Sequence, residues 1–258
     1  MPDPNESNSI AVESLVDKNV GIGNQPRVLV CVCTLNEAAN IESLIHGVRA
    51  ALPDADVLVV DDDSPDRTAE LVQKIAEMDP AVRVFVRKGE TGLGSAIRFG
   101  MSVALEEGYC YFLNMDGDLS HDPDQLPALF ELAMSKQVDV VIGSRYVAGG
   151  SVVGWSLHRR LMSRFVNWFA TGGLGLAVKD CSGSFRCYRV ETLQKLGLEN
   201  LQSNGYAVLE EVLVRLQRQG ASMAEVPIDF NDRKMGKSKL TAREALRSLF
   251  QIFSMLGK

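Results

Sequence analysis

Short apolar segments that each end in polar or acidic residues recur along the first half of the chain. The segments at 28–33, 57–60 and 109–114 consist mainly of apolar residues, which is typical of strands buried on both faces. Between them, apolar residues recur at the spacing of a helix, as they do at 41–48. Strands that alternate with helices through short connections predict an α/β fold with a parallel, doubly wound sheet.

The same alternation continues along the rest of the chain, although it becomes less regular after about residue 150. Further strands are predicted at 82–86, 138–142 and 223–228, and further helices at 94–107, 125–135, 157–170, 208–219 and 241–256. The predicted domain organisation is a disordered tail over 1–25, one α/β domain over 26–240, and an amphipathic C-terminal helix over 241–258 that offers contact with a membrane surface.

Polar and acidic clusters follow three of the predicted strands, at the point where each strand ends. The clusters are Thr34-Leu35-Asn36-Glu37, Asp61-Asp62-Asp63 and Asp116-Gly117-Asp118. Ligands of open parallel sheets bind beyond the carboxyl ends of the strands, so we expect the three clusters to converge at one edge. Carboxylates that lie together are costly unless cations or hydrogen-bond donors compensate them, and this predicts a metal site.

Asp116 and Asp118 are the strongest candidates for metal ligands. They stand two positions apart around Gly117, so both carboxylates can reach one divalent cation while the glycine lets a ligand approach the backbone. Mg²⁺ prefers a few carboxylates completed by waters and substrate phosphates. Such a pair alone is more often a solvated turn, but its place beside two other acidic clusters favours the metal.

Arginines predict where anions bind. Arg145 follows the predicted strand 138–142, and at this edge its guanidinium can hold a phosphate through two hydrogen bonds. Arg159 lies near the start of the helix 157–170, with Ser163 one turn further on. These residues form either a second anion pocket or a solvated helix face.

The overall charge and the cysteines exclude or favour broad classes of protein. The 258-residue chain has a formal net charge of −6, which argues against general nucleic-acid binding, although seven basic residues and one acidic residue lie in 233–258. No apolar stretch reaches the roughly 18 to 20 residues that cross a bilayer, and the first residues lack the pattern of a signal peptide. The five cysteines form an odd, sparse set, which predicts reduced thiols and a cytoplasmic location.

Together and in this order, the motifs resemble those of the dolichol-phosphate (polyprenol-phosphate) mannosyltransferases, inverting glycosyltransferases of family 2 with the GT-A fold. The resemblance runs over residues 27–245 and rests mainly on 34–37, 59–66, 116–118, 143–146 and 236–239. It implies a Rossmann-like, mostly parallel sheet flanked by helices. It also implies transfer of mannose from GDP-mannose to a polyprenyl (dolichyl) monophosphate, with inversion at the anomeric carbon.

The resemblance assigns a role to each matching residue. Asp116 and Asp118, with Ser120, would hold Mg²⁺ or Mn²⁺. The donor-binding residues would be Cys33, Leu35, Glu37, Asp61, Gly117, Arg233 and Lys239. The acceptor phosphate would contact Arg145, Arg159 and Ser163, and the residues counted as catalytic are Asp116, Asp118 and Arg145. The chain departs from the family where Cys33 replaces Pro, Leu35 replaces Tyr and Ser120 replaces Gln.

Two alternatives stay open from the residues. A polyprenyl-phosphate glycosyltransferase that uses a UDP-sugar, such as UDP-glucose, would need the same fold and acceptor site. A non-catalytic nucleotide-sugar-binding subunit would also keep the fold, although the presence of both Asp116 and Asp118 speaks against it. For an enzyme that uses GDP-mannose or a UDP-sugar, we expect peripheral contact with the cytoplasmic face of a membrane. This contact would be made through the predicted helix 241–258 or through a membrane-anchoring partner subunit.

Overall fold

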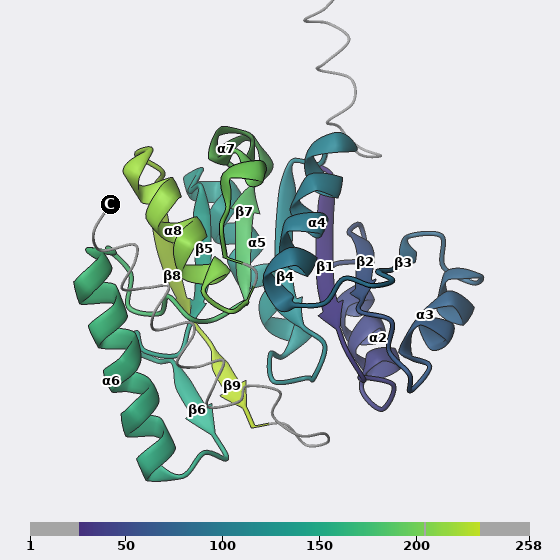
Figure 1. Ribbon diagram of the computed structural model, residues 1–258, viewed down its shortest axis with the longest axis horizontal. Helices are drawn as coiled ribbons and strands as arrows, with labels where there is room; N and C mark the ends of the chain where they lie inside the picture. Colours follow the sequence, from purple (N-terminus) through teal and green to yellow (C-terminus); the bar gives the residue numbers. More distant parts are fainter. Residues whose placement is uncertain (1–25, 204, 233–258) are drawn as a thin grey trace, which may run out of the picture.

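The computed structural model describes residues 26–203 and 205–232, and its centre is one seven-stranded sheet (Figure 1). The strand order is β3-β2-β1-β4-β7-β5-β8, and a two-stranded sheet, β6-β9, stands beside it. The strands are β1 (Val28–Thr34), β2 (Asp56–Asp61), β3 (Val82–Val86), β4 (Tyr111–Asp116), β5 (Val140–Ser144), β6 (Ser151–Val153), β7 (Arg186–Arg189), β8 (Met223–Pro227) and β9 (Asp229–Asn231).

Helices cover both faces of the large sheet. They are α2 (Ile41–Ala51), α3 (Thr68–Ala76), α4 (Leu93–Glu106), α5 (Leu126–Lys136), α6 (Leu157–Leu174), α7 (Val190–Leu196) and α8 (Val208–Arg218), with short 3₁₀ turns η1 (Pro123–Gln125) and η2 (Leu198–Asn200). The parallel α/β architecture predicted from the alternating pattern is therefore confirmed.

The core has two parts because successive side chains of a strand point to opposite faces. In β1, Val30 and Val32 belong to a buried cluster with α2, α3 and α5, whereas Leu29 and Cys31 belong to a cluster with α4, α7 and α8. The helix α6 supplies only Ala170 to the buried residues of these clusters, and Figure 1 shows it at the margin of the molecule.

One strand departs from the predicted parallel sheet. β7 runs antiparallel to both of its neighbours, β4 and β5, while the other pairs in the large sheet are parallel. The alternating pattern did not reveal this strand because it is only four residues long and includes two arginines.

Two strands begin and end two residues later than the sequence predicts. β4 pairs with β1 from Val28↔Tyr111 to Cys33↔Asp116, so Asp116 is the last residue of the strand. β5 likewise ends at Ser144. Pairing with the neighbouring strand, which local pattern cannot reveal, determines these bounds.

The strand order changes direction between β1 and β4. From β1 the chain proceeds to β2 on one side, whereas β4 lies on the other side, so the connections diverge where these two strands end. Open α/β sheets bind ligands at such a switch point. Among the described residues, no helix is both long and apolar enough to cross a membrane.

Candidate active site

At the ends of β1 and β2, Asp61 organises the backbone. Its buried carboxylate accepts hydrogen bonds from the Thr34 hydroxyl at 2.7 Å, the Ser64 amide at 2.8 Å and the Ser64 hydroxyl at 2.6 Å. These bonds join the end of β1 to the turn after β2. The carboxylate of Asp61 thus stabilises this turn. Its predicted contact with a nucleotide stays a prediction.

The next carboxylate, Asp62, is paired with an arginine that the sequence did not single out. Arg87 donates from Nε to Asp62 at 2.8 Å, also contacts Asp62 through Nη2, and is only 3% exposed. Asp62 also accepts from the Gly92 amide at 2.8 Å, where a backbone φ of 123° favours glycine. The hydrogen bond from Gly92 therefore joins the Gly-rich turn 92–95 to the end of β2, which is a structural role for this turn.

The Asp116-Gly117-Asp118 turn lies against the end of β1. A Cβ atom at Gly117 would come within 2.9 Å of Thr34 Cγ2 and 3.2 Å of Glu37 Cγ, so only glycine fits here without displacing the β1 end. Asp116 has a side chain that is 32% exposed, whereas Asp118 is buried and accepts a hydrogen bond from the Ser120 amide at 3.0 Å. The turn thus presents one carboxylate toward solvent and anchors the other.

This turn fits a divalent cation that shares its coordination with a substrate. The Ser120 hydroxyl oxygen is buried and has no hydrogen-bond partner among the described residues, which leaves it available as a further oxygen ligand. Within the same described residues, no group of three or more His, Cys, Asp and Glu side chains is placed to hold a metal ion. Two carboxylates and a hydroxyl are the incomplete set of oxygen ligands that Mg²⁺ completes with waters and phosphates.

A cluster of four rings, His121, Trp155, Phe185 and Phe230, lies beside this turn. His121 stacks on Phe185 at 4.9 Å between ring centroids and meets Phe230 edge-on at 5.3 Å, and Phe230 in turn contacts Trp155 at 5.5 Å. Burial lowers the pKa of His121, although the nearby Asp116 carboxylate acts in the opposite direction. His121 Nδ1 lies 3.9 Å from Asp116 Oδ2.

His121 was not singled out as a site residue in the sequence, because its spacing from other histidines fits no metal motif. Its position three residues after Asp118 was the available signal. The ring cluster shows that this histidine borders the predicted site.

On the other side of the ring cluster, Arg145 is held by a buried carboxylate. Its Nε and Nη2 donate to the two oxygens of Asp180, each at 2.7 Å, and Nη2 also donates to the Ser182 hydroxyl at 2.8 Å. The guanidinium carbon lies 5.4 Å from the centre of the Phe230 ring. Phe230 therefore connects the His121 side of the site with the Arg145 side.

The pairing keeps both groups charged. Burial alone would lower the pKa of Arg145, but the charge of Asp180 outweighs burial and raises that pKa above its usual value. Burial would likewise raise the pKa of Asp180, and Arg145 lowers it instead. The ion pair fixes the direction in which Arg145 presents its guanidinium, because two parallel hydrogen bonds leave it little freedom.

The predicted acceptor residues of α6 lie near the same cluster. Arg159 stacks over Trp155 at 4.0 Å and pairs with Asp232 at 3.1 Å, and its side chain is 48% exposed. Ser163 shares a hydrogen bond of 2.7 Å with the Tyr146 hydroxyl. The fold thus brings residues of 145–146 and of α6 to one side of the ring cluster.

The remaining predicted donor residues follow β1. Cys33 is partly buried at the end of β1, and Leu35 is likewise half-buried, whereas Glu37 is buried and accepts from Asn40 at 2.9 Å. All five cysteines are free thiols, as expected. Residues 1–25, Arg233, Lys239 and the segment 241–258, for which the sequence predicts a tail, donor contacts and a helix, lie outside the described residues.

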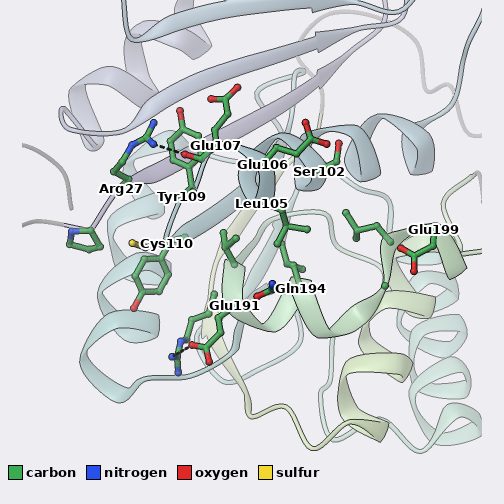
Figure 2. Close-up of a pocket in the computed structure, with 18 residues that line it drawn as sticks. Arg27, Ser102, Leu105, Glu106, Glu107, Tyr109, Cys110, Glu191, Gln194 and Glu199 are labelled. Atoms are coloured by element: carbon green, nitrogen blue, oxygen red, sulfur yellow. Dashed lines mark hydrogen bonds and ion pairs between the residues drawn. The ribbon is translucent and has the colours of Figure 1, made fainter. Parts of the chain in front are cut away.

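A separate pocket of about 1440 Å³ lies at the opposite edge of the sheet (Figure 2). Arg27 and Tyr109, which precede β1 and β4, line it together with Glu107, Glu191 and Gln194. Arg27 donates to the Glu107 carbonyl oxygen at 2.6 Å. Since the predicted site lies at the carboxyl ends of the strands, this pocket at the amino ends is distinct from it.

Comparison with known proteins supplies a family and relatives. Residues 29–197 match the family model of glycosyl transferase family 2. An undecaprenyl-phosphate mannosyltransferase of Micrococcus luteus is 39% identical over 215 residues, which cover 83% of this chain and 88% of the relative. A polyprenol monophosphomannose synthase of Mycolicibacterium smegmatis is 35% identical over 244 residues, which cover 92% of each chain.

Solved structures with the same fold are more distant in sequence. A mannosyltransferase of Pyrobaculum calidifontis, in complex with GDP-Man and Mn²⁺, is 18% identical with a TM-score of 0.61, and the match covers 95% of this chain and 70% of that one. A glucosyl-3-phosphoglycerate synthase of Mycobacterium tuberculosis, in complex with Mn²⁺, UDP and phosphoglyceric acid, is 19% identical with a TM-score of 0.63, covering 89% and 77%. These likenesses confirm the predicted GT-A fold.

Proposed function

The chain belongs to glycosyl transferase family 2, and we propose that it transfers mannose from GDP-mannose to a polyprenyl monophosphate. The observation that carries this proposal is the similarity to two mannosyltransferases of polyprenyl phosphates, which extends over 83% and 92% of the chain. The arrangement of carboxylates and arginines around one ring cluster supports it, because the reaction must hold two anionic substrates together.

Asp116 and Asp118 would hold Mg²⁺ or Mn²⁺, with Ser120 as a further ligand. The bound cation would neutralise the negative charge that develops on the departing nucleotide diphosphate. Around it, Gly117 keeps the turn close to the β1 end, and Asp118 is oriented by the Ser120 amide at 3.0 Å. Cys33, Leu35, Glu37 and Asp61 would line the donor pocket, and Arg233 and Lys239 would contact the donor from outside the described residues.

On the acceptor side, Arg145, Arg159 and Ser163 would bind the phosphate of the lipid. A phosphate monoester has a second pKa of about 6, so it is anionic near neutral pH and needs no strong general base to attack. Arginines that neutralise this anion and hold it near the donor lower the barrier by position and charge. Asp180 would keep Arg145 in place during this step through the two hydrogen bonds of 2.7 Å.

We propose inversion at the anomeric carbon because the motifs of the chain resemble those of the inverting glycosyltransferases of family 2, the family whose model it matches. Analysis of the product's anomeric configuration by NMR tests this part of the proposal. Retention of configuration would contradict it without affecting the donor or the acceptor.

A transfer assay tests the function. Purified protein, GDP-[³H]mannose, Mg²⁺ or Mn²⁺ and a polyprenyl phosphate are mixed, and label in the organic phase is counted. Asp116→Ala should reduce the rate at least about 1000-fold if the carboxylate holds the cation. Asp124→Ala is the matched control, because Asp124 is exposed in the following turn and should leave the rate within about twofold.

Other outcomes discriminate between the alternatives. Label from UDP-glucose but not from GDP-mannose would keep the fold and the site and overturn the donor. Label from neither donor, even with a membrane fraction added, would overturn the proposed reaction. Equal loss in Asp116→Ala and Asp124→Ala would contradict a specific role for the Asp116-Gly117-Asp118 turn.

A further inference from the structure

The helix α6 turns a mainly polar side toward the protein and an apolar side toward solvent, which is the reverse of an ordinary surface helix. Its inward side is mainly polar: Ser163, Asn167 and Thr171 lie there with Ala170, and Leu174 in the last turn packs against the core. Asn167 is 3% exposed, donates to the Lys179 carbonyl oxygen and accepts from the Cys181 amide at 3.0 Å. Hydrogen bonds to the loop 179–182 and to Tyr146 therefore hold this helix, where an ordinary surface helix would use an apolar stripe.

Its outward side is apolar. Seven of the eleven exposed large hydrophobic residues in the described part of the chain lie on α6: Leu157, Leu161, Met162, Phe165, Val166, Trp168 and Phe169. Trp168 is 68% exposed and Leu157 is 72% exposed. The seven residues recur at intervals that place them within one side of a helix, so they form one continuous apolar face.

Positive charge accompanies this apolar face. The helix contains Arg159, Arg160 and Arg164 and no Asp or Glu, although the whole chain has a net charge of −6. Arg160 and Arg164 are exposed. A helix with an apolar face, arginines and no acidic residue is complementary to an anionic lipid surface, where acyl chains receive the apolar side chains and headgroups receive the arginines.

We propose that the apolar face of α6 docks onto an anionic lipid surface. The inference deepens the proposed function, because an acceptor with a polyprenyl chain resides in a membrane. A second copy of the chain is a poorer occupant, since each α6 brings the exposed Arg160 and Arg164 to the contact and supplies no acidic residue of its own. The C-terminal segment is also poorly suited, because residues 233–258 carry seven basic residues and one acidic residue.

Docking through α6 would place the acceptor residues at the surface. Arg159 belongs to the first turn of α6, and Ser163 follows one turn later on the same helix. The loop 179–182, which contacts Asn167, carries Asp180, the partner of Arg145. The lipid-facing helix is thus attached by hydrogen bonds to the groups that would receive a phosphate at the membrane surface.

Vesicle co-sedimentation tests the docking without catalysis. Full-length protein is mixed with phosphatidylglycerol–phosphatidylcholine vesicles that contain no polyprenyl phosphate and no nucleotide. Leu161→Gln/Phe165→Gln/Trp168→Gln should bind about 100-fold more weakly, while glutamine preserves helix propensity. Met78→Gln/Met134→Gln removes exposed apolar side chains away from α6 and should bind like the wild type.

Two further readouts locate the contact. The chain has two tryptophans, and only Trp168 lies on the apolar face of α6. Brominated lipids should therefore quench the fluorescence of the wild type strongly, and most of this quenching should disappear in Trp168→Phe. Arg160→Gln/Arg164→Gln should weaken binding about tenfold at low salt and less at high salt. Transfer to a short, water-soluble prenyl phosphate should stay within about twofold in the triple glutamine variant.

Defined results would overturn the docking. Unchanged vesicle binding in the triple variant would place the contact elsewhere, for example in 233–258. A lipid-free dimer that the same variant converts to a monomer would identify a second copy as the occupant. If wild type binds vesicles through Trp168 but transfers no sugar to any acceptor, the docking stands and the proposed function fails.

Discussion

The helices α2 and α6 are both amphipathic, yet they use their apolar faces in opposite ways. In α2, the apolar residues Ile41, Leu44, Ile45 and Val48 are all fully buried against the sheet. In α6, the seven large apolar residues from Leu157 to Phe169 face solvent, and the side toward the protein is mainly polar and hydrogen-bonded. The comparison shows that an apolar stripe identifies a face without identifying what the face contacts.

The two helices also cover different kinds of interior. Beneath α2, the side chains of β1 and β4 form an apolar cluster. Near α6, the interior contains the ion pair of Arg145 with Asp180 and the buried side chains of Arg186 and Glu210. Stability should therefore depend on apolar volume in the first region and on charge compensation in the second.

The largest expected effect tests the charged region. Asp180→Ala should lower the free energy of unfolding by about 3 to 5 kcal/mol, because it leaves the largely buried Arg145 without its partner. Urea denaturation measures the loss, and thermal unfolding serves if the variant is too unstable. The control is Glu70→Ala, which removes an exposed ion pair at 3.9 Å and should cost no more than about 0.5 kcal/mol.

A pair of leucine truncations tests the contrast directly. Leu44→Ala in α2 should cost about 2 to 5 kcal/mol, since it creates a cavity in a fully buried cluster. Leu161→Ala in α6 should change stability by no more than about 0.5 kcal/mol, because its side chain is 59% exposed. If urea denaturation showed equal losses of unfolding free energy for the two variants, α6 would be covered in solution. The difference between α2 and α6 would then not hold.

The smallest expected effect concerns Glu210 in α8. Burial raises the pKa of Glu210 from 4.5 to about 7, and its Oε2 has no hydrogen-bond partner among the described residues. The folded state therefore retains this proton to higher pH than the unfolded state. The stabilisation is complete below about pH 4.5 and is lost as the pH rises to about 7.

Glu210→Gln should consequently raise the free energy of unfolding at pH 8 by about 1 to 3 kcal/mol and flatten its dependence between pH 4.5 and 7. The adjacent Glu211→Gln is the control with the opposite sign. Burial alone would raise the pKa of Glu211, but hydrogen bonds from the Gln202 and Ser203 amides lower it instead. Denaturation curves across this range distinguish the two variants, and a destabilised Glu210→Gln would contradict the assignment.

Much of the fold was predictable from local pattern. Strands that alternate with helices predicted the parallel sheet and the position of the Asp116-Gly117-Asp118 turn at a strand end, and the resemblance in motifs predicted the family that the comparisons confirm. The antiparallel β7 was not predictable in this way, because a four-residue strand with two arginines has no clear alternation. Its direction depends on pairing with β4 and β5, which are distant in the chain.

The candidate site divides in the same manner. Asp116, Gly117 and Asp118 were identified from adjacent positions, and their roles as ligands of a cation or donor stay a prediction. The partners of the arginines were not identified, because Arg145 and Asp180 are 35 positions apart and Arg87 and Asp62 are 25 apart. Partnerships at such separations arise only when the loops that follow different strands meet at one edge of the sheet.

The sequence by itself determined most of the strands and helices and the acidic turn after β4, because each is a local pattern of neighbouring residues. The tertiary structure decided which carboxylates are paired with arginines and which side of α6 is exposed. These features depend on the contacts that distant segments make, and the hydrogen bonds of Asn167 to the loop 179–182 turn the polar side of α6 inward. The apolar side is then left outward, available to a lipid surface.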